Sequence, residues 1–358
     1  MSGRSSELHI EVAVSAAEIP EGWDGYAGGH PHAAIFHARI WQVVLTTCYP
    51  YRFFGVYAIN TEGEIVGVLP VYLVASKLTG KRMVSAPFSY ICDPLADDEA
   101  IGGALLEKAK EISRENGASY YELKCRFADP VAEKSFVESG QFETYLLDLI
   151  VSEEEIWAKT HKSIIQRGVN KAKKEGVEIK VGNDENCAEM FHHLNLLTCR
   201  KHGIPAQPLA FHREVWNSLA LNQKADFLFA YYMDEPIAAM VIFYHRGTAT
   251  YMYGASDERF LAQRPNHLLL WEAIMRAKDK GMMTFDLGRV SDDNPGLKEF
   301  KQRWGAATAR LHYYYWPEKR GVGAVNRKSL KFRITTFMFS KMPLSVTARL
   351  TWLYKHLA

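Results

Sequence analysis

Short runs of alternating hydrophobic and polar residues, separated by turn residues, cover most of this chain. Residues 51–74 and 225–244 each predict a β-hairpin, because β-rich flanks surround a short polar turn. Apolar positions at helical spacing predict helices at residues 99–116 and 267–280, and a short strand follows each helix. The same order of elements therefore occurs in both halves. The pattern predicts two similar α/β domains, although no residue-level identity joins them.

The predicted boundary between the two domains lies near residue 150. The segment Ser152-Glu153-Glu154-Glu155 has the pattern of a helix capping box and would begin the second half. We therefore predict domains at residues 1–150 and 151–318, followed by a basic helical tail at residues 319–358.

Composition adds few constraints. With 358 residues, 47% hydrophobic and 23% charged, the chain resembles an ordinary globular protein of two domains. The formal net charge of +2 requires no polyanionic partner, so contact with nucleic acid would need a local patch. The five cysteines are scattered without a C-x-x-C pair, which indicates reduced thiols in the cytoplasm. No apolar run is long enough for a signal peptide or a membrane span.

The tail has an unusual charge pattern. Residues 319–358 contain nine Lys or Arg residues and no Asp or Glu, and Pro343 divides the segment into two predicted helices. Two interpretations remain open. The helices pack on the body of the protein, or they lie on an anionic lipid surface as interfacial helices.

The stretch from Met283 to Gly305 carries the strongest candidate chemistry. Its short strand places Asp286 on the side opposite Phe285, and a polar loop leads to a helix that carries Lys301. An amphipathic helix with a solvated basic face would have the same pattern. In sequence, Phe285-Asp286-Leu287-Gly288 is followed by an Asn-Pro-Gly loop and by LKEFKQRWG, which ends at Gly305.

This ordered pattern resembles the closing segment of FemAB-type acyltransferases, which are paired GNAT-fold proteins. Some members are encoded with bacterial exopolysaccharide and protein-sorting systems. The resemblance covers roughly residues 30–315 and is strongest in the second half. It implies an α/β fold with two tandem GNAT-like domains, mixed sheets and a C-terminal helical tail. It also implies an N-acyltransferase.

A second part of the resemblance lies on a predicted helix at residues 161–175. Helical spacing puts Arg167, Lys171 and Lys174 on one stripe, which is a solvated face or an anion-binding face. FemAB-like chains carry a comparable Lys/Arg-rich helix where a donor or acceptor anion docks. The resemblance thus implies substrate-binding roles for Lys162, Arg167 and Lys171.

The segment before the helix at residues 267–280 predicts a phosphate site. Backbone N–H groups at a helix N-terminus attract anions, and Arg264 adds positive charge. Asn266 is a suitable N-cap, and His267 follows it. GNAT enzymes hold the pyrophosphate of acyl-coenzyme A at this position, usually on a glycine-rich loop. Here the loop reads Gln-Arg-Pro-Asn-His and lacks these glycines. FemAB-like chains also lack them, so this difference agrees with the resemblance.

Acyl transfer to an amine needs a base and a stabiliser for the oxyanion. We predict Asp286 as base or orienting group, and Lys301 and Arg289 as anion-binding groups. Tyr251 and Tyr253 alternate with Met252 along one predicted strand, so both would face the cleft, and we predict Tyr253 as a catalytic residue there. Three histidines near residues 30–37 lack a helix-spaced pair and an acidic ligand, so we predict no metal.

The sequence thus predicts an N-acyltransferase that uses acyl-coenzyme A and modifies an amine on a cell-envelope or polysaccharide precursor. The partners would be a small-molecule or lipid-linked substrate and a membrane surface reached by the tail. Two alternatives remain: a peptidyltransferase that uses aminoacyl-tRNA on a peptidoglycan precursor, and a non-catalytic, membrane-associated protein that binds a glycan lipid. Because the chain is nearly neutral, a nucleic-acid partner is disfavoured. The expected location is the cytoplasm, including the inner face of the membrane.

Overall fold

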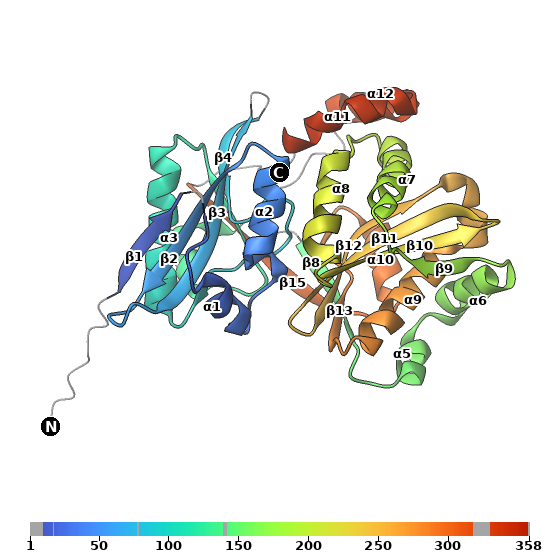
Figure 1. Ribbon diagram of the computed structural model, residues 1–358, viewed down its shortest axis with the longest axis horizontal. Coiled ribbons are helices and arrows are strands. Elements are labelled where there is room, and N and C mark those ends of the chain that lie inside the picture. Colours follow the sequence, from blue (N-terminus) through green and yellow to red (C-terminus); the bar gives the residue numbers. More distant parts are fainter. Residues whose placement is uncertain (1–9, 17, 77–78, 139–141, 318–329, 357–358) are drawn as a thin grey trace. The chain divides into compact units, whose positions relative to one another are not determined.

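The computed structural model describes residues 10–16, 18–76, 79–138, 142–317 and 330–356. The chain divides into two compact units, Met1–Gln141 with Leu311–Gly323, and Phe142–Arg310 with Ala324–Leu357. Each unit is an α/β structure built on a mixed sheet, as the sequence predicts (Figure 1).

The bounds of these units differ from the predicted domain bounds at two places. Strand β8 (Phe142–Asp148) lies before the predicted boundary near residue 150, yet it pairs with β13 (Thr284–Asp286) of the second unit. Strand β15 (Ala307–Trp316) ends in the first unit, where it pairs with β6 (Tyr121–Cys125). A strand belongs to the unit whose strands it pairs with. Strands β8 and β15 pair with strands far away in the sequence, so local sequence does not reveal their unit.

The first unit has a sheet in the order β1-β2-β3-β4-β6-β15, in which β4 and β6 run parallel. Helix α3 (Glu99–Glu115) begins where the Asp98 side chain accepts a hydrogen bond from Ile101 N at 2.8 Å, as predicted from the capping pattern. The other elements of this unit are β1 (Glu11–Ser15), α1 (Trp23–Gly29), η1 (Ile35–His37), α2 (Arg39–Cys48), β2 (Arg52–Ile59), β3 (Ile65–Ser76), β4 (Gly80–Val84), β5 (Leu95–Ala96), α4 (Pro130–Ser135) and β7 (Val137–Glu138).

The second unit has a sheet in the order β8-β13-β12-β11-β10-β9, with β14 also paired to β8. Its elements up to the tail, besides β8 and β13, are α5 (Glu153–Lys159), η2 (Lys162–Gln166), α6 (Arg167–Lys174), β9 (Glu178–Val181), α7 (Asn186–His202), α8 (Leu209–Val215), η3 (Trp216–Ala220), β10 (Ala225–Tyr232), β11 (Glu235–His245), β12 (Thr248–Ser256), η4 (Glu258–Gln263), α9 (Pro265–Asp279), β14 (Val290–Ser291) and α10 (Pro295–Gln302). The order hairpin, strand, helix, parallel strand occurs in both units.

Helices cover both faces of the second sheet. One face packs against α6 and α9, and its core includes Met240, Ile242, Leu269 and Phe285. The other face carries α7 and α8 (Figure 1). Side chains of β11 alternate between these faces, so Phe243 points toward α7 and α8.

The parallel strands β12 and β13 pair only over a short distance. Their register runs from Thr248 opposite Thr284 to Thr250 opposite Asp286. Beyond Thr250, β12 continues to Ser256, while β13 ends and the chain turns at Gly288 in the left-handed region, with φ of 78°. The two strands therefore separate at their carboxyl ends.

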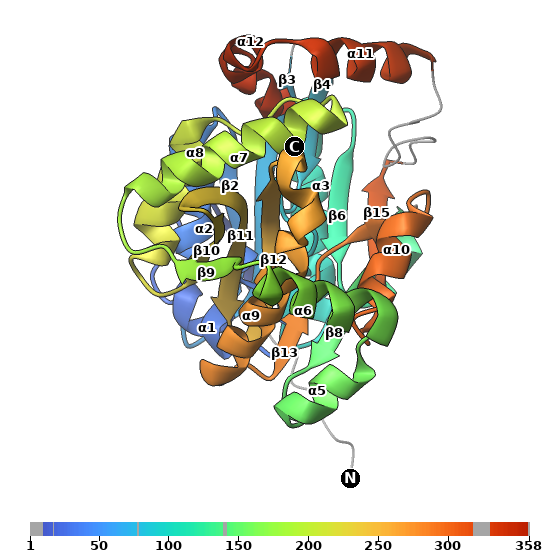
Figure 2. The same ribbon diagram turned by 90° about the vertical axis from the view of Figure 1, so that its right-hand side faces the viewer.

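The tail consists of α11 (Leu330–Lys341), α12 (Leu344–Arg349) and η5 (Thr351–His356). Both helices pack on α7, and Leu344 and Ala348 contact a small buried cluster at the C-terminal part of that helix (Figure 2). A tail helix pair that packs on the body is thereby confirmed. None of the helices in the described part of the chain is both long and apolar enough to cross a bilayer.

Candidate functional site

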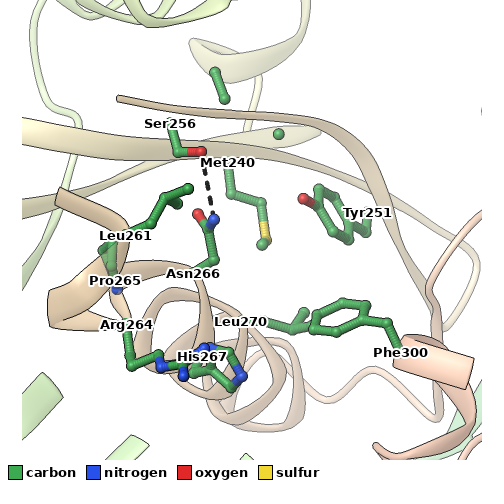
Figure 3. A pocket seen from close by; sticks show the side chains of 12 residues that line it. Met240, Tyr251, Ser256, Leu261, Arg264, Pro265, Asn266, His267, Leu270 and Phe300 are labelled. Atoms are coloured by element: carbon green, nitrogen blue, oxygen red, sulfur yellow. Dashed lines mark hydrogen bonds between the residues drawn. The ribbon is translucent and has the colours of Figure 1, made fainter. Parts of the chain in front are cut away.

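A cavity of about 310 Å³ lies beside the part of β12 that β13 leaves unpaired (Figure 3). Met240, Leu270 and Phe300 supply apolar walls, while Tyr251 and Ser256 of β12 supply hydroxyl groups. The first turn of α9 closes the remaining side. Apolar walls with a few convergent polar groups are typical of a site for a small organic ligand.

The N-terminus of α9 opens into this cavity. Arg264 precedes the helix in the left-handed conformation, with φ of 58° and ψ of 37°, and Pro265 is the first helical residue. Among the described residues, no side chain caps the first turn. The prediction that Asn266 is the N-cap is therefore wrong, because the helix starts two residues earlier and its N-cap is Arg264. Uncapped N–H groups, the helix dipole and Arg264 together favour an anionic group.

Asn266 and His267 also line the cavity, as their predicted role requires. The side-chain amide of Asn266 lies 3.4 Å from Ser256 Oγ, so it faces β12 across the opening (Figure 3). Burial and, to a lesser extent, the nearby charge of Arg264 lower the pKa of His267 to about 4. His267 is thus neutral near pH 7. Its ring stands perpendicular to that of Phe300, with centroids 6.2 Å apart.

A bulge in β12 separates its two tyrosines. Ile242 pairs with Tyr251 and Val241 pairs with Tyr253, so Met252 is the extra residue. Tyr251 consequently faces the cavity and Tyr253 faces α7 and α8. The expectation that both tyrosines share one side is wrong, because it assumed regular alternation. A Cβ atom at Gly254 would collide with the Tyr251 hydroxyl, so glycine at this position lets the ring lie over the strand.

Tyr253 is surrounded by rings on the opposite face. The centroids of Phe211 and Phe243 lie 5.9 and 6.0 Å from its ring centroid, and that of His212 lies 6.5 Å away. Its buried hydroxyl interacts only weakly with the Gln207 side chain, and among the described residues neither this hydroxyl nor Gln207 Nε2 completes a hydrogen bond of normal geometry. Burial raises the pKa of Tyr253 far above its usual range.

Asp286 and Lys301 belong to one buried polar cluster at the end of β13. Asp286 is fully buried, and its Oδ1 accepts hydrogen bonds from Thr144 Oγ1 at 2.5 Å and from Gly288 N at 2.8 Å. Lys301 Nζ donates to the carbonyl oxygen of Gly288 at 2.6 Å and lies 3.4 Å from that of Arg289. The loop that follows β13 is therefore held from both sides.

The solvated-face interpretation of Lys301 is wrong, because only 5% of this residue is exposed. Burial lowers the pKa of its ammonium group to about 8, while Asp286 opposes this shift. Gly288 lies between this cluster and the cavity wall: its Cβ would be 3.2 Å from the Tyr251 carbonyl oxygen and 3.9 Å from Lys301 Nζ.

Comparison with known families identifies the fold that carries this site. The profile of the acetyltransferase (GNAT) domain family matches residues 159–302, which include α9, the cavity and the Asp286–Lys301 cluster. The chain carries a GNAT acetyltransferase domain. No curated protein matches the sequence.

Solved structures extend the likeness to the whole chain. FemX matches with a TM-score of 0.67 and 15% identity, over 84% of this chain and 97% of its own. L-PGS from Bacillus licheniformis matches with a TM-score of 0.55 and 13% identity, over 92% and 99%. A tandem GNAT protein from the clavulanic acid biosynthesis pathway matches with a TM-score of 0.53 and 13% identity, over 85% of this chain and 98% of its own. The predicted α/β fold with tandem GNAT-like domains is thus confirmed, and the matched GNAT domain agrees with the predicted likeness to FemAB-type acyltransferases.

The predicted anion-binding residues outside the cavity lie at the surface of the GNAT domain. Lys162 begins the π-helical turn η2, and Arg167 and Lys171 follow on α6, all three exposed. Lys171 is 3.5 Å from Glu175. Arg289 is exposed with its guanidinium 4.4 Å from the centre of the Phe142 ring. None of these four residues lines the cavity.

Sequence reasoning missed several residues of the GNAT-domain site. Tyr251 was expected beside Tyr253 on one side of the strand but was not chosen as a catalytic residue, although the glycine after a tyrosine-rich strand signals a bulge or close backbone approach. Thr144, which donates to Asp286, has no local signal because it is 142 residues away in sequence. In the described residues, no group of three or more His, Cys, Asp or Glu side chains could hold a metal ion.

Proposed function

We propose that this protein is an N-acyltransferase that moves an acyl group from coenzyme A to an amine. The observation that supports this proposal is the cavity between the first turn of α9 and the free edge of β12. Its anion-attracting end suits a pyrophosphate, and its apolar walls suit a pantetheine arm and a short acyl chain.

Tyr251 is our candidate for the proton donor to the departing thiolate. Its side chain lines the cavity, and burial raises its pKa to about 12, so the phenol stays protonated at neutral pH. When the neutral amine nitrogen bonds to the acyl carbon, the carbon–sulfur bond breaks and the departing thiolate takes the proton of Tyr251. The proton that the nitrogen then releases returns to the tyrosinate, so the phenol is restored. Tyr251 replaces Tyr253 in this role because only Tyr251 faces the cavity.

Lys301 and Asp286 act in this proposal by holding the Gly288 loop against β12. Lys301 Nζ donates to the backbone carbonyl oxygens of Gly288 and Arg289, and Gly288 packs on the carbonyl of Tyr251. The pair would thereby keep the strands apart at the cavity. Lys162, Arg167, Lys171 and Arg289 remain candidates for contact with an anionic acceptor at the surface.

The acceptor in this proposal is an amine on a cell-envelope or polysaccharide precursor, free or lipid-linked. The protein would act in the cytoplasm, and at the inner face of the membrane when its acceptor is lipid-linked. We retain the division into two GNAT-like domains and a tail, with residues 151–318 as the catalytic domain.

Calorimetry with coenzyme A and acetyl-coenzyme A tests the donor. The wild type should bind both, and Arg264→Ala should weaken binding ~10-fold through loss of one cation near the phosphates. Arg246→Ala is the matched control, since this exposed arginine lies in the β11–β12 turn away from the cavity. Tight, salt-sensitive binding of charged tRNA with no heat from coenzyme A would favour the aminoacyl-tRNA alternative. Donor binding without acylation of any amine would favour the non-catalytic alternative.

A further inference from the structure

The tail exposes four large apolar side chains. Exposed fractions are 64% for Phe337 and 55% for Met338 of α11, 40% for Val346 of α12, and 53% for Trp352 of η5. We call these four residues the tail surface. Such exposure is unusual for aromatic side chains, and neighbouring exposed apolar residues mark interaction sites.

Other residues of the same helices are packed. Phe339 and Thr347 are buried, and a Cβ atom at Gly203 would touch Thr336. Leu344 and Ala348 contact the cluster of Leu196, Cys199 and Ala206. The tail is therefore packed on α7, and the residues of the tail surface stay exposed even though the tail helices are docked.

The charge around the tail surface is of one sign. Lys341 lies 5.9 Å from the centre of the Phe337 ring, Lys355 lies 5.8 Å from that of Trp352, and Arg349 is exposed between them in sequence. Residues 319–358 contain no acidic side chain. A second copy of this surface would bring like charges together, which disfavours a symmetric dimer here.

We propose that the tail surface docks on a lipid bilayer that contains anionic lipids. Trp and Phe side chains lie favourably at the level of the lipid headgroups, and lysine side chains reach past them to the phosphates. Basic residues near an anionic leaflet add attraction that no neutral membrane offers. The four apolar anchors and the basic residues around them fit both requirements.

Vesicle binding tests the docking surface without any acceptor. The full chain should sediment with phosphatidylcholine–phosphatidylglycerol vesicles, less with pure phosphatidylcholine, and less at high salt. Trp352 is the exposed tryptophan of the described chain, so brominated lipids should quench its fluorescence. Phe337→Ser with Trp352→Ser, and separately Lys341→Glu with Lys355→Glu, should each weaken vesicle binding ~10-fold or more.

Met233→Ser is the matched control, because Met233 is exposed in the β10–β11 turn, away from the tail. All variants should keep the wild-type melting temperature and coenzyme A affinity, so loss of vesicle binding would not reflect unfolding or failure of the donor site. The proposal is overturned if the wild type ignores anionic vesicles, or if both tail variants bind them as the wild type does. A tail-dependent dimer without vesicle binding would assign the surface to a second copy instead.

Discussion

Gly168 of α6 touches His267 of α9 so closely that a Cβ atom at Gly168 would lie 2.6 Å from His267 Cδ2. His267 lines the cavity, whereas Gly168 is buried behind it. The absence of a side chain at position 168 therefore sets how near α6 comes to the first turn of α9. This contact connects the helix of the predicted basic stripe to the candidate donor site.

Gly168→Ala should move the His267 ring and weaken coenzyme A binding. Overpacking of this kind costs about 1–3 kcal/mol of unfolding free energy, which exceeds the gain of about 1 kcal/mol from replacing glycine in a helix. Denaturant unfolding and calorimetry with coenzyme A would measure the two effects.

The matched test for Gly168 adds His267→Ala. Without the ring, the clash disappears and only the helix-propensity gain remains, so Gly168→Ala should stabilise the His267→Ala background. If Gly168→Ala has the same effect in both backgrounds, the two residues are not coupled.

Lys301 should make stability depend on pH in the alkaline range. Its pKa of about 8 in the folded protein lies below the usual lysine value of 10.5, so the unfolded chain binds the proton more tightly. Below pH 8 the buried ammonium group is therefore destabilising, by roughly 3 kcal/mol. This cost should disappear as pH rises from 8 to 10.5, since stability increases with pH wherever the unfolded state binds more protons.

Comparison with Lys301→Met isolates this effect, because other groups titrate equally in both proteins. The unfolding free energy of the wild type, relative to the variant, should rise between pH 8 and 10.5. A constant difference over that range would show that Lys301 has an ordinary pKa. We also expect the variant to lose turnover, on the order of 10²-fold, because the Gly288 loop loses its anchor.

Removal of the Tyr253 hydroxyl should not destabilise the protein. This hydroxyl is buried and completes no hydrogen bond within the described chain, so Tyr253→Phe removes an unsatisfied group. Tyr244→Phe is the matched control, since the Tyr244 hydroxyl donates to Asp226 at 2.8 Å. Thermal unfolding should show a loss of about 1 kcal/mol for Tyr244→Phe and none for Tyr253→Phe. Equal losses would mean that Tyr253 has a structural partner.

Much of the fold follows from local sequence. The pattern predicted helices α3 and α9 and the Ser152 capping box that begins α5, because caps and apolar periodicity act over a few residues. The resemblance also directed attention to Asp286 and Lys301, which the structure brings together through Gly288.

Local sequence did not reveal the burial of Lys301 or the bulge in strand β12. Lys301 is buried because the loop after β13 folds over its helix, and this depends on residues far from it in sequence. The bulge at Met252 moves Tyr253 out of the cavity, and a regular alternation of apolar and polar residues does not reveal it. The predicted N-cap, Asn266, lies two residues after the observed one, Arg264, since helix ends are the least predictable part of a helix.

We expect Arg264 to have two separable effects: its backbone conformation lowers stability, and its charge contributes to coenzyme A binding. It holds φ of 58° before α9, a region in which side chains cost roughly 1–2 kcal/mol and glycine does not. Arg264→Gly should therefore raise the unfolding free energy, or leave it unchanged, while coenzyme A binding falls. Arg264→Ala should lose the same charge but keep the strain. The stability difference between these two variants measures the strain alone.

Arg246 provides the control for this comparison, because it also lies in the left-handed region, with φ of 45°, and its side chain is exposed outside the cavity. Arg246→Gly should stabilise the protein as Arg264→Gly does, yet leave coenzyme A affinity unchanged. Arg264→Lys should retain most of the affinity, because a cation remains near the phosphates. If both glycine variants weaken coenzyme A binding equally, the loss reflects a general change in the sheet, and the first turn of α9 is not the phosphate site.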